Sequence, residues 1–176
     1  MEQVNHLYCM CTDDHLKPRC FAILHCKQRL VFTQAVLGIF SKHRQQQMEP
    51  ESGGLLFAEF DFPLIQVVEV SVPHATDKRW RTLFIPNRVQ QRKLIKQCFK
   101  NGRHFVGEWH THPEPKPTPS GLDLKSMGDA FVKSYHELNY FIMVIVGNKE
   151  ETLELWVSAH DGVGHHRLSE CVTMQT

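Results

Sequence analysis

The segment HTHPEPKPTPSGLD, residues 110–123, decides the fold of this chain and indicates its chemistry. A β-prone run over residues 104–110 leads into it and a helical pattern begins at Ser120, so the segment connects a strand to a helix. Side chains alternate along a strand, so His110 and His112 point to the same face, and Asp123 arrives from the helix. Two imidazoles and one carboxylate suit a single Zn²⁺ ion and leave a fourth position for water, which favours a catalytic over a structural zinc site.

Two roles are open for Ser120. Its hydroxyl is suited to capping the helix, with Asp123 three residues later completing a capping box. It is equally suited to donating a hydrogen bond to the oxyanion that forms on an attacked carbonyl. Asp123 alone would be a first-turn acid favoured by the helix dipole, but the upstream histidines favour a zinc ligand. The loop before Ser120 holds four prolines, which reduce the entropy lost when it orders and suit a connection that positions a ligand.

A hydrolytic site of this kind also needs a carboxylate that accepts the proton of water and delivers it to the leaving amine. Glu51 is the preferred candidate, because it precedes two glycines and an apolar strand that allow close backbone approach on a rigid support. Glu49, Glu108 and Glu114 are the alternatives. Glu108 lies two residues before His110 and would share its face, whereas Glu114 sits in the proline loop, where a solvated role is favoured.

Composition is ordinary for a globular protein. The 176 residues are 41% hydrophobic and 22% charged, enough for one domain with a substantial core. A net charge of +1 favours neither nucleic acid nor an anionic membrane as a partner. There is no apolar run of about 18 residues that would span a membrane, and the first residues lack the pattern of a secretory signal. We therefore expect a cytoplasmic protein.

The six cysteines are scattered and include no C-x-x-C pair. They are expected to be reduced, buried thiols of a cytosolic protein. Cys9 and Cys11 form a lone C-x-C, which is only a weak signal for a metal.

Hydrophobic periodicity predicts helices and strands around one mixed sheet. Strands are expected over residues 20–24, 55–60, 66–72, 82–85, 104–110, 140–146 and 152–158. Residues 73–81 are polar and are expected to form an exposed loop. The fold class is therefore α/β or mixed α+β, with helices on the faces of a single mixed sheet.

Three helices are expected. The first is capped by Thr33 and runs to about residue 47, the second runs from Pro86 and Asn87 to about residue 101, where Gly102 ends it, and the third begins at Ser120. Their core-facing residues are expected to be Val36, Leu37, Ile39 and Phe40 in the first, Leu94, Ile95, Cys98 and Phe99 in the second, and Leu124, Met127, Phe131, Val132 and Tyr135 in the third.

The chain resembles the JAMM metalloproteases, also called JAB or MPN-plus proteins, whose signature is a glutamate followed by H-x-H, seven residues and S-x-x-D. The resemblance covers about residues 21–158 and includes the context ESGGLL around the glutamate. It implies a single JAB/MPN-type domain over residues 1–176, with a core of about 20–158 and short terminal extensions. The resemblance implies zinc binding by His110, His112 and Asp123, a general-base role for Glu51, and stabilisation of the tetrahedral intermediate by Ser120.

A closer resemblance comes from the stretch GEWHTHP, residues 107–113, and the proline-alternating loop after it. These are similar to the bacterial JAMM proteins of CBASS antiphage operons, which remove conjugates of a cGAS-like nucleotidyltransferase. The resemblance implies a deubiquitinase-like isopeptidase that cuts after the extended C-terminal tail of such a nucleotidyltransferase or of a ubiquitin-like protein. After Asp123 there is no room for the zinc-binding insertion of some eukaryotic deubiquitinases, so one zinc ion is expected.

An extended tail is suited to pairing with an exposed strand edge, and residues 73–85 are a candidate for that edge. Trp80, Phe84 and Trp109 are candidate substrate contacts, although a place in the core is favoured for Phe84 and Trp109. A local basic zone is either a solvated face or a surface for an acidic partner protein. Its members are Lys78, Arg79, Arg81, Arg88, Arg92, Lys93, Lys96 and Lys100.

Two other functions are compatible with the motif. One is a nucleic-acid-associated protein like the RadC family, which shares the H-x-H and S-x-x-D pattern, although the near-neutral charge and the lack of a helix-turn-helix pattern count against it. The other is a non-catalytic MPN scaffold, which is disfavoured because such proteins usually lose ligands and this chain retains them all. A zinc deaminase is excluded because its H-x-E and P-C-x-x-C halves are absent.

Overall fold

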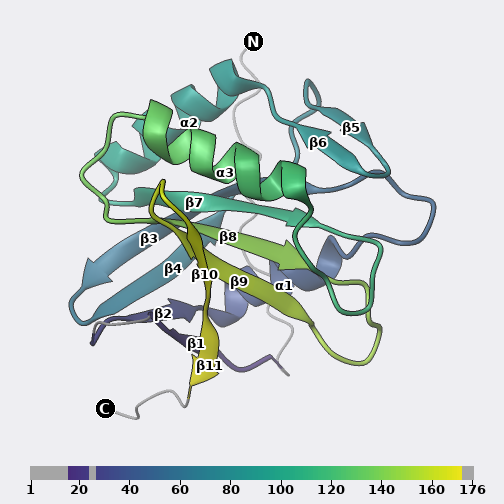
Figure 1. Cartoon of the computed structure of the whole chain (residues 1–176), viewed down its shortest axis with the longest axis horizontal. Coiled ribbons are helices and arrows are strands. Elements are labelled where there is room, and N and C mark those ends of the chain that lie inside the picture. The colour runs from purple at the N-terminus through teal and green to yellow at the C-terminus, as the bar shows by residue number, and fades with distance from the viewer. Residues whose placement is uncertain (1–15, 24–26, 172–176) are drawn as a thin grey trace.

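The structure, a computed structural model, describes residues 16–23 and 27–171 and builds them around a nine-stranded mixed sheet (Figure 1). The strands of this sheet are β1 Arg19–Ala22, β2 Arg29–Phe32, β3 Gly53–Asp61, β4 Leu64–Val70, β7 His104–Thr111, β8 Phe141–Val146, β9 Leu155–His160, β10 His165–Arg167 and β11 Ser169–Cys171. Their order is β10-β9-β8-β7-β3-β4-β2-β1-β11. A separate hairpin pairs β5 Lys78–Trp80 with β6 Leu83–Ile85. The helices are α1 Gln34–Lys42, α2 Arg88–Lys100 and α3 Gly121–Lys133.

Helices cover both faces of the sheet because its central strands are apolar on both faces. All six residues of β8 are buried, and alternate ones belong to different clusters. One cluster joins Ile142, Val144 and Val146 to α1, and the other joins Phe141, Met143 and Ile145 to Met127 of α3. In β3 the same alternation turns Leu56 and Ala58 toward α1, and Leu55 and Phe57 toward Cys98 of α2. The predicted mixed α/β fold is confirmed.

The arrangement of β7, α3 and β8 positions the segment 110–123. β7 pairs with β8 in parallel, and α3 lies between them in the chain. The connection from the carboxyl end of β7 to the amino end of α3 is residues 112–120. Where parallel strands are joined through a helix, ligands commonly bind beyond the carboxyl ends of the strands, so this connection lies where a site is expected.

The predicted helix starts are confirmed by their caps. The Thr33 hydroxyl accepts a hydrogen bond from Val36 N–H at 3.4 Å, and Asn87 Oδ1 accepts one from Val89 N–H at 3.0 Å. Gly102 ends α2 with a φ of 76°, in the left-handed region that glycine adopts at little cost.

The first helix ends at Lys42, so the prediction that it continues to about residue 47 is wrong. The reason is Gln45, whose side chain is 1% exposed. Its amide donates hydrogen bonds to the carbonyls of Glu49 and Arg81, at 2.7 and 2.8 Å, so the chain turns inward there instead of completing another helical turn.

The apolar stripes of α2 and α3 are narrower than predicted. Phe99, Val132 and Tyr135 were expected in the core but are exposed, Tyr135 fully so. Only Cys98 of α2 and Met127 of α3 are buried, because each helix touches the sheet along a single line. The other predicted core residues of these helices are half-buried. Leu94 and Ile95 pack against the cluster around Cys98, and Leu124 and Phe131 pack against the cluster around Met127.

Residues 73–81 are not wholly a loop, because β5 lies within them and pairs with the predicted strand β6. Three other strands were missed. β2 has only four residues and pairs in parallel with β4. β10 and β11 have three residues each and are polar, so they carry no hydrophobic pattern.

β10 and β11 are consecutive in the chain, yet they pair with opposite edges of the sheet. Only Leu168 separates them; it is buried and its N–H donates to the carbonyl of Val157 at 2.9 Å. At the far edge Arg19 of β1 holds the Glu170 carboxylate with two hydrogen bonds of 2.8 and 2.7 Å. The segment 165–171, which we call the closing segment, therefore bridges the two edges (Figure 1).

Within the described ranges, none of the helices has the length and apolar character needed to cross a membrane. Cys20, Cys98 and Cys171 are free thiols, and the first two are buried as predicted. Cys9, Cys11 and Cys26 lie outside the described residues.

Candidate active site

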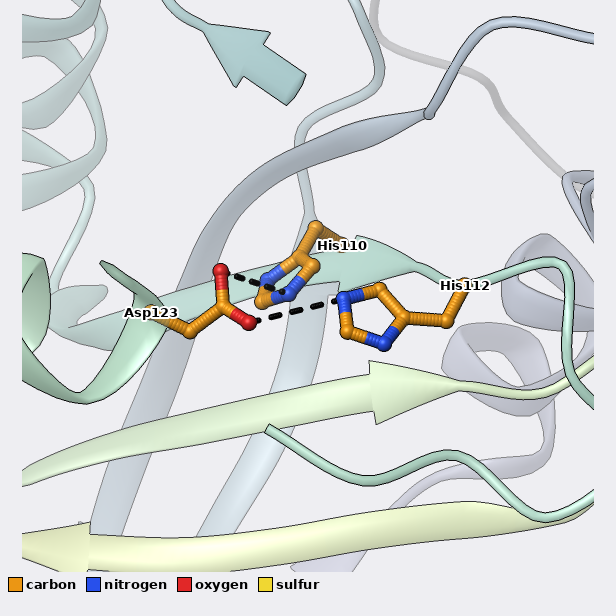
Figure 2. Close-up of side chains that lie close together, drawn as sticks. All are labelled: His110, His112 and Asp123. Atoms are coloured by element: carbon orange, nitrogen blue, oxygen red, sulfur yellow. Dashed lines mark ion pairs between the residues drawn. The ribbon is translucent and has the colours of Figure 1, made fainter. Parts of the chain in front are cut away.

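The three predicted metal ligands converge at the carboxyl end of β7 (Figure 2). His110 and His112 come from β7 and the residue after it, and Asp123 comes from the first turn of α3. The Nε2 atoms of His110 and His112 each lie 3.5 Å from an oxygen of Asp123, one on Oδ1 and the other on Oδ2. The potential ligand atoms of the three residues lie within 4.8 Å of one another, close enough to hold one metal ion.

The capping box at the start of α3 fixes the direction of the Asp123 carboxylate. Asp123 Oδ2 accepts the backbone N–H of Ser120 at 2.7 Å, and the Ser120 hydroxyl accepts the backbone N–H of Asp123 at 3.2 Å. The predicted capping role of Ser120 is therefore confirmed. This bond uses the Ser120 oxygen as an acceptor and leaves its hydroxyl hydrogen available to another group.

The donor set fits a divalent metal ion. His110 Nε2 is buried and has no hydrogen-bond partner in the described protein, and such an orphaned ring nitrogen is what a metal ion would satisfy. Burial alone would raise the pKa of Asp123, but the close approach and charges of the two histidines, together with the hydrogen bond from Ser120 N–H, hold it well below its usual range. Burial opposes protonation of His112, yet the Asp123 carboxylate outweighs it and raises the pKa of that imidazole. The site thus already favours a cation between the imidazoles and the carboxylate.

Glu51 lies beside this cluster, as the pairing of β3 with β7 requires. Gly53 pairs with His110, so Glu51, two residues earlier, lies on the same face of the sheet near His112. Its side chain is buried, and burial raises its pKa to about 7, an effect that nearby His112 partly offsets. A carboxylate with this pKa is well matched to accepting and releasing protons near neutral pH.

The four residues share a cleft of about 650 Å³. Its walls come from β6, the amino end of α2, the carboxyl end of β7 and the first turns of α3. The lining includes Glu51, His110, His112, Ser120 and Asp123.

The alternative glutamates are less well placed. Glu108 lines the cleft, but its carboxylate is paired with Arg88 at 2.8 Å. Glu49 is exposed, and its carboxylate accepts the backbone N–H of Gln46 at 3.1 Å. Glu114 lies at the exposed rim of the cleft, in the proline loop. Glu51 is the only one of the four that is buried.

The predicted aromatic contacts divide into two groups. Trp109 is 1% exposed and belongs to the core, where its Nε1 donates to the carbonyl of Ser71 at 2.9 Å. Phe84 is half-buried in the cleft wall, and Trp80 is half exposed on the hairpin. Gly53 makes room for Phe84, because a Cβ at residue 53 would lie 2.7 Å from its ring.

Sequence reasoning missed the polar residues that support Glu51. Thr111 is fully buried, and its Oγ1 accepts the N–H of Ser52 at 2.9 Å and donates to Gln45 Oε1 at 3.3 Å. The available signal was strand alternation, which turns the residue between two outward-facing histidines to the opposite face. Gln45 carries no such signal. Of the basic zone, the cations of α2 are exposed, whereas Arg79 is half-buried.

Comparisons with known proteins agree with this geometry. Residues 33–159 match the family described as prokaryotic homologs of the JAB domain. A Pseudomonas aeruginosa protein named CD-NTase/cGAS isopeptidase is 35% identical over 131 residues, which cover 72% of this chain and 82% of that protein. A protein of the same name from Escherichia coli is 29% identical over 73% of this chain and 79% of that protein. Another from Vibrio cholerae is also 29% identical, over 69% of this chain and 77% of that protein. The solution structure of a Desulfitobacterium hafniense protein is similar with a TM-score of 0.58 at 20% identity, covering 77% of this chain and 87% of that one, which indicates a shared fold.

Proposed function

Because the chain belongs to the prokaryotic homologs of the JAB domain, we propose that it is a zinc-dependent isopeptidase of the JAMM type. The observation that carries this proposal is the convergence of His110, His112 and Asp123 in a cleft that also contains the buried Glu51. We further propose one ion per chain, since the described residues contain one group of three potential ligands.

Each residue of the cleft has a distinct role in this proposal. When bound, Zn²⁺ acidifies a water molecule and polarises the substrate carbonyl. Glu51 takes the proton of the attacking water and delivers it to the leaving amine, which its raised pKa supports. The Ser120 hydroxyl donates its free hydrogen to the oxyanion of the attacked carbonyl. The capping and catalytic roles of Ser120 are compatible, because the first uses a lone pair and the second uses the hydrogen.

We propose that the substrate is a conjugated cGAS-like nucleotidyltransferase, cut after its extended C-terminal tail. The names of the relatives from three bacterial species support this class of substrate. The cleft supports an extended tail, because β6 forms one of its walls and, among the described strands, pairs only with β5. Its other edge is suited to backbone pairing with such a tail. Removal of the conjugate would regulate conjugation in antiphage defence, in the cytoplasm.

The test uses the zinc-loaded protein and a nucleotidyltransferase joined through its C-terminal carboxyl to a lysine of a carrier protein. We expect release of both intact proteins, with mass spectrometry finding the free carboxylate at the end of the tail. Glu51→Gln is expected to abolish most of the release, whereas Glu49→Gln, a nearby exposed carboxylate, serves as the matched control and is expected to leave it unchanged.

Absence of cleavage by the zinc-loaded protein, on both the isopeptide conjugate and a linear fusion, would overturn the proposed activity. Steeply salt-dependent binding to DNA in the same preparation would favour a RadC-like role instead. Binding of the conjugate without turnover would favour a non-catalytic scaffold.

A further inference from the structure

Arg79, in the middle of β5, is turned toward the segment that carries Glu51. It is half-buried, whereas both of its neighbours on the strand are exposed. Its Nε donates to the carbonyl of Glu51 at 2.5 Å, and its Nη2 donates to Ser52 Oγ at 2.8 Å and to the carbonyl of Pro50 at 3.2 Å. One guanidinium therefore holds three consecutive residues centred on Glu51.

The backbone of Glu51 makes the same connection to the hairpin. Its N–H donates to the carbonyl of Trp80, the residue after Arg79, at 2.8 Å. Both backbone polar groups of Glu51 therefore bond to β5. Ser52, by contrast, exchanges two 2.9 Å hydrogen bonds with Thr111 of β7. Glu51 is thus held between the strand of the two histidines and the hairpin that borders the cleft.

The buried side chain of Gln45 also links the Glu51 segment to the hairpin and to β7. Its amide nitrogen donates to the carbonyls of Glu49 and Arg81, and its oxygen accepts the hydroxyl hydrogen of Thr111. A single buried amide therefore links the turn before Glu51, the turn between β5 and β6, and β7. Both hydrogens of its NH₂ group are used, which is the arrangement expected of a buried glutamine.

The chemistry of Arg79 favours positioning rather than surface solvation. Its three acceptors are two carbonyls and a hydroxyl, all neutral, so the contacts do not form an ion pair. A planar guanidinium presents several donors in a fixed fork and can hold these acceptors together. A lysine ammonium at the same position is a compact charge on a flexible stem and would not reproduce this geometry.

We propose that Arg79 is a positioning residue, which fixes Glu51 relative to the metal ligands and transmits movement of the β5–β6 hairpin to it. This inference rests on the proposed function, because it assigns Glu51 the role of general base. It predicts that a substrate tail seated along β6 stabilises the productive position of Glu51 through Arg79. Substrate binding and proton transfer would then be coupled through one side chain.

The first test compares Arg79→Ala with Lys78→Ala, which removes the same charge from an exposed neighbour on the same strand. We expect Arg79→Ala to lower kcat by about tenfold to a hundredfold, since a displacement of a catalytic group by about 1 Å has effects of this size. KM is expected to change by less than about threefold, and Lys78→Ala is expected to change neither constant. Zinc content is measured in each variant and is expected to be the same.

A double-mutant cycle separates positioning from a general structural effect. If Arg79 acts through Glu51, then Arg79→Ala in the Glu51→Gln background is expected to change the residual single-turnover rate by less than about threefold. An equal loss of rate in both backgrounds, or an unchanged kcat in the single variant, would overturn the inference. If the alanine variant does not fold, Arg79→Lys replaces it in every comparison, with the same expected direction and the same contradicting outcomes.

Hydrogen exchange supplies a readout that does not depend on activity. In metal-free protein, Arg79→Ala is expected to speed amide exchange in a peptide covering residues 49–55, whereas Lys78→Ala is not. Unchanged exchange in the arginine variant would contradict the inference even if the wild-type protein proved inactive. Failure of wild-type cleavage, with the expected exchange result, would overturn the proposed function alone.

Discussion

Replacing Thr111 by valine is expected to destabilise the protein by about 2–4 kcal/mol, although the two side chains have nearly the same shape. Thr111, the residue between His110 and His112, is fully buried. Its hydroxyl accepts a hydrogen bond from Ser52 N–H and donates one to Gln45 Oε1. Valine leaves both groups buried without this partner, at a cost of about 1–3 kcal/mol each. Removal of the hydroxyl itself recovers part of that cost, because a methyl group is easily buried, so the net effect falls below the sum.

Urea unfolding of the metal-free protein at pH 7 measures this loss directly. A loss of about 3 kcal/mol would lower the Tm of a chain of this size by roughly 6–12 °C. Thr111→Ser is the control, because it keeps the hydroxyl and loses one methyl group, at a cost of about 1 kcal/mol. A valine variant that is no less stable than the serine variant would refute the reasoning, since the hydroxyl would then contribute nothing.

Three further predictions concern single residues. Glu51→Gln is expected to retain zinc and to lose roughly 10²- to 10⁴-fold in turnover, the usual effect of removing a general base; full turnover would reassign the role. His110→Ala is expected to lose zinc and activity together, and metal analysis that still finds one tightly bound ion would contradict its assignment as a ligand. Burial lowers the pKa of His160 to about 4. Between pH 6.5 and 4 the unfolded chain therefore binds a proton that the native chain does not. The free energy of unfolding consequently decreases as the pH is lowered, by up to about 3 kcal/mol. This decline is expected to shrink in His160→Gln, and urea unfolding at pH 7 and pH 5 that gives equal losses in both proteins would contradict it.

The elements that the sequence predicted well are those determined by local chemistry. Thr33, Asn87 and Ser120 cap their helices because a short polar side chain can reach the first free N–H groups without help from the rest of the fold. The convergence of His110 with its partners was predictable for the same reason, since strand alternation and a capped helix need only nearby residues.

What the sequence could not predict depends on contacts between distant segments. β2 is recognised as a strand through its pairings with β1 and β4, and the hairpin strand β5 through its pairing with β6. Arg79 contacts Glu51 from 28 residues away, and Gln45 contacts Arg81 from 36 residues away. Neither Arg79 nor Gln45 belongs to a motif. Tyr135 was assigned to the core by helical spacing, but α3 ends at Lys133 before that residue can meet the sheet.

The closing segment has a consequence for how the molecule is made. Its two short strands are synthesised after every other strand of the sheet, and together they occupy both edges. Before residues 165–171 are synthesised, β9 and β1 are the outer strands of the sheet. Their unpaired backbone edges can then pair with other chains. Once residues 165–171 are available, β10 adds to β9 and β11 adds to β1, so the last pairings at the two ends of the described sheet are expected to form together.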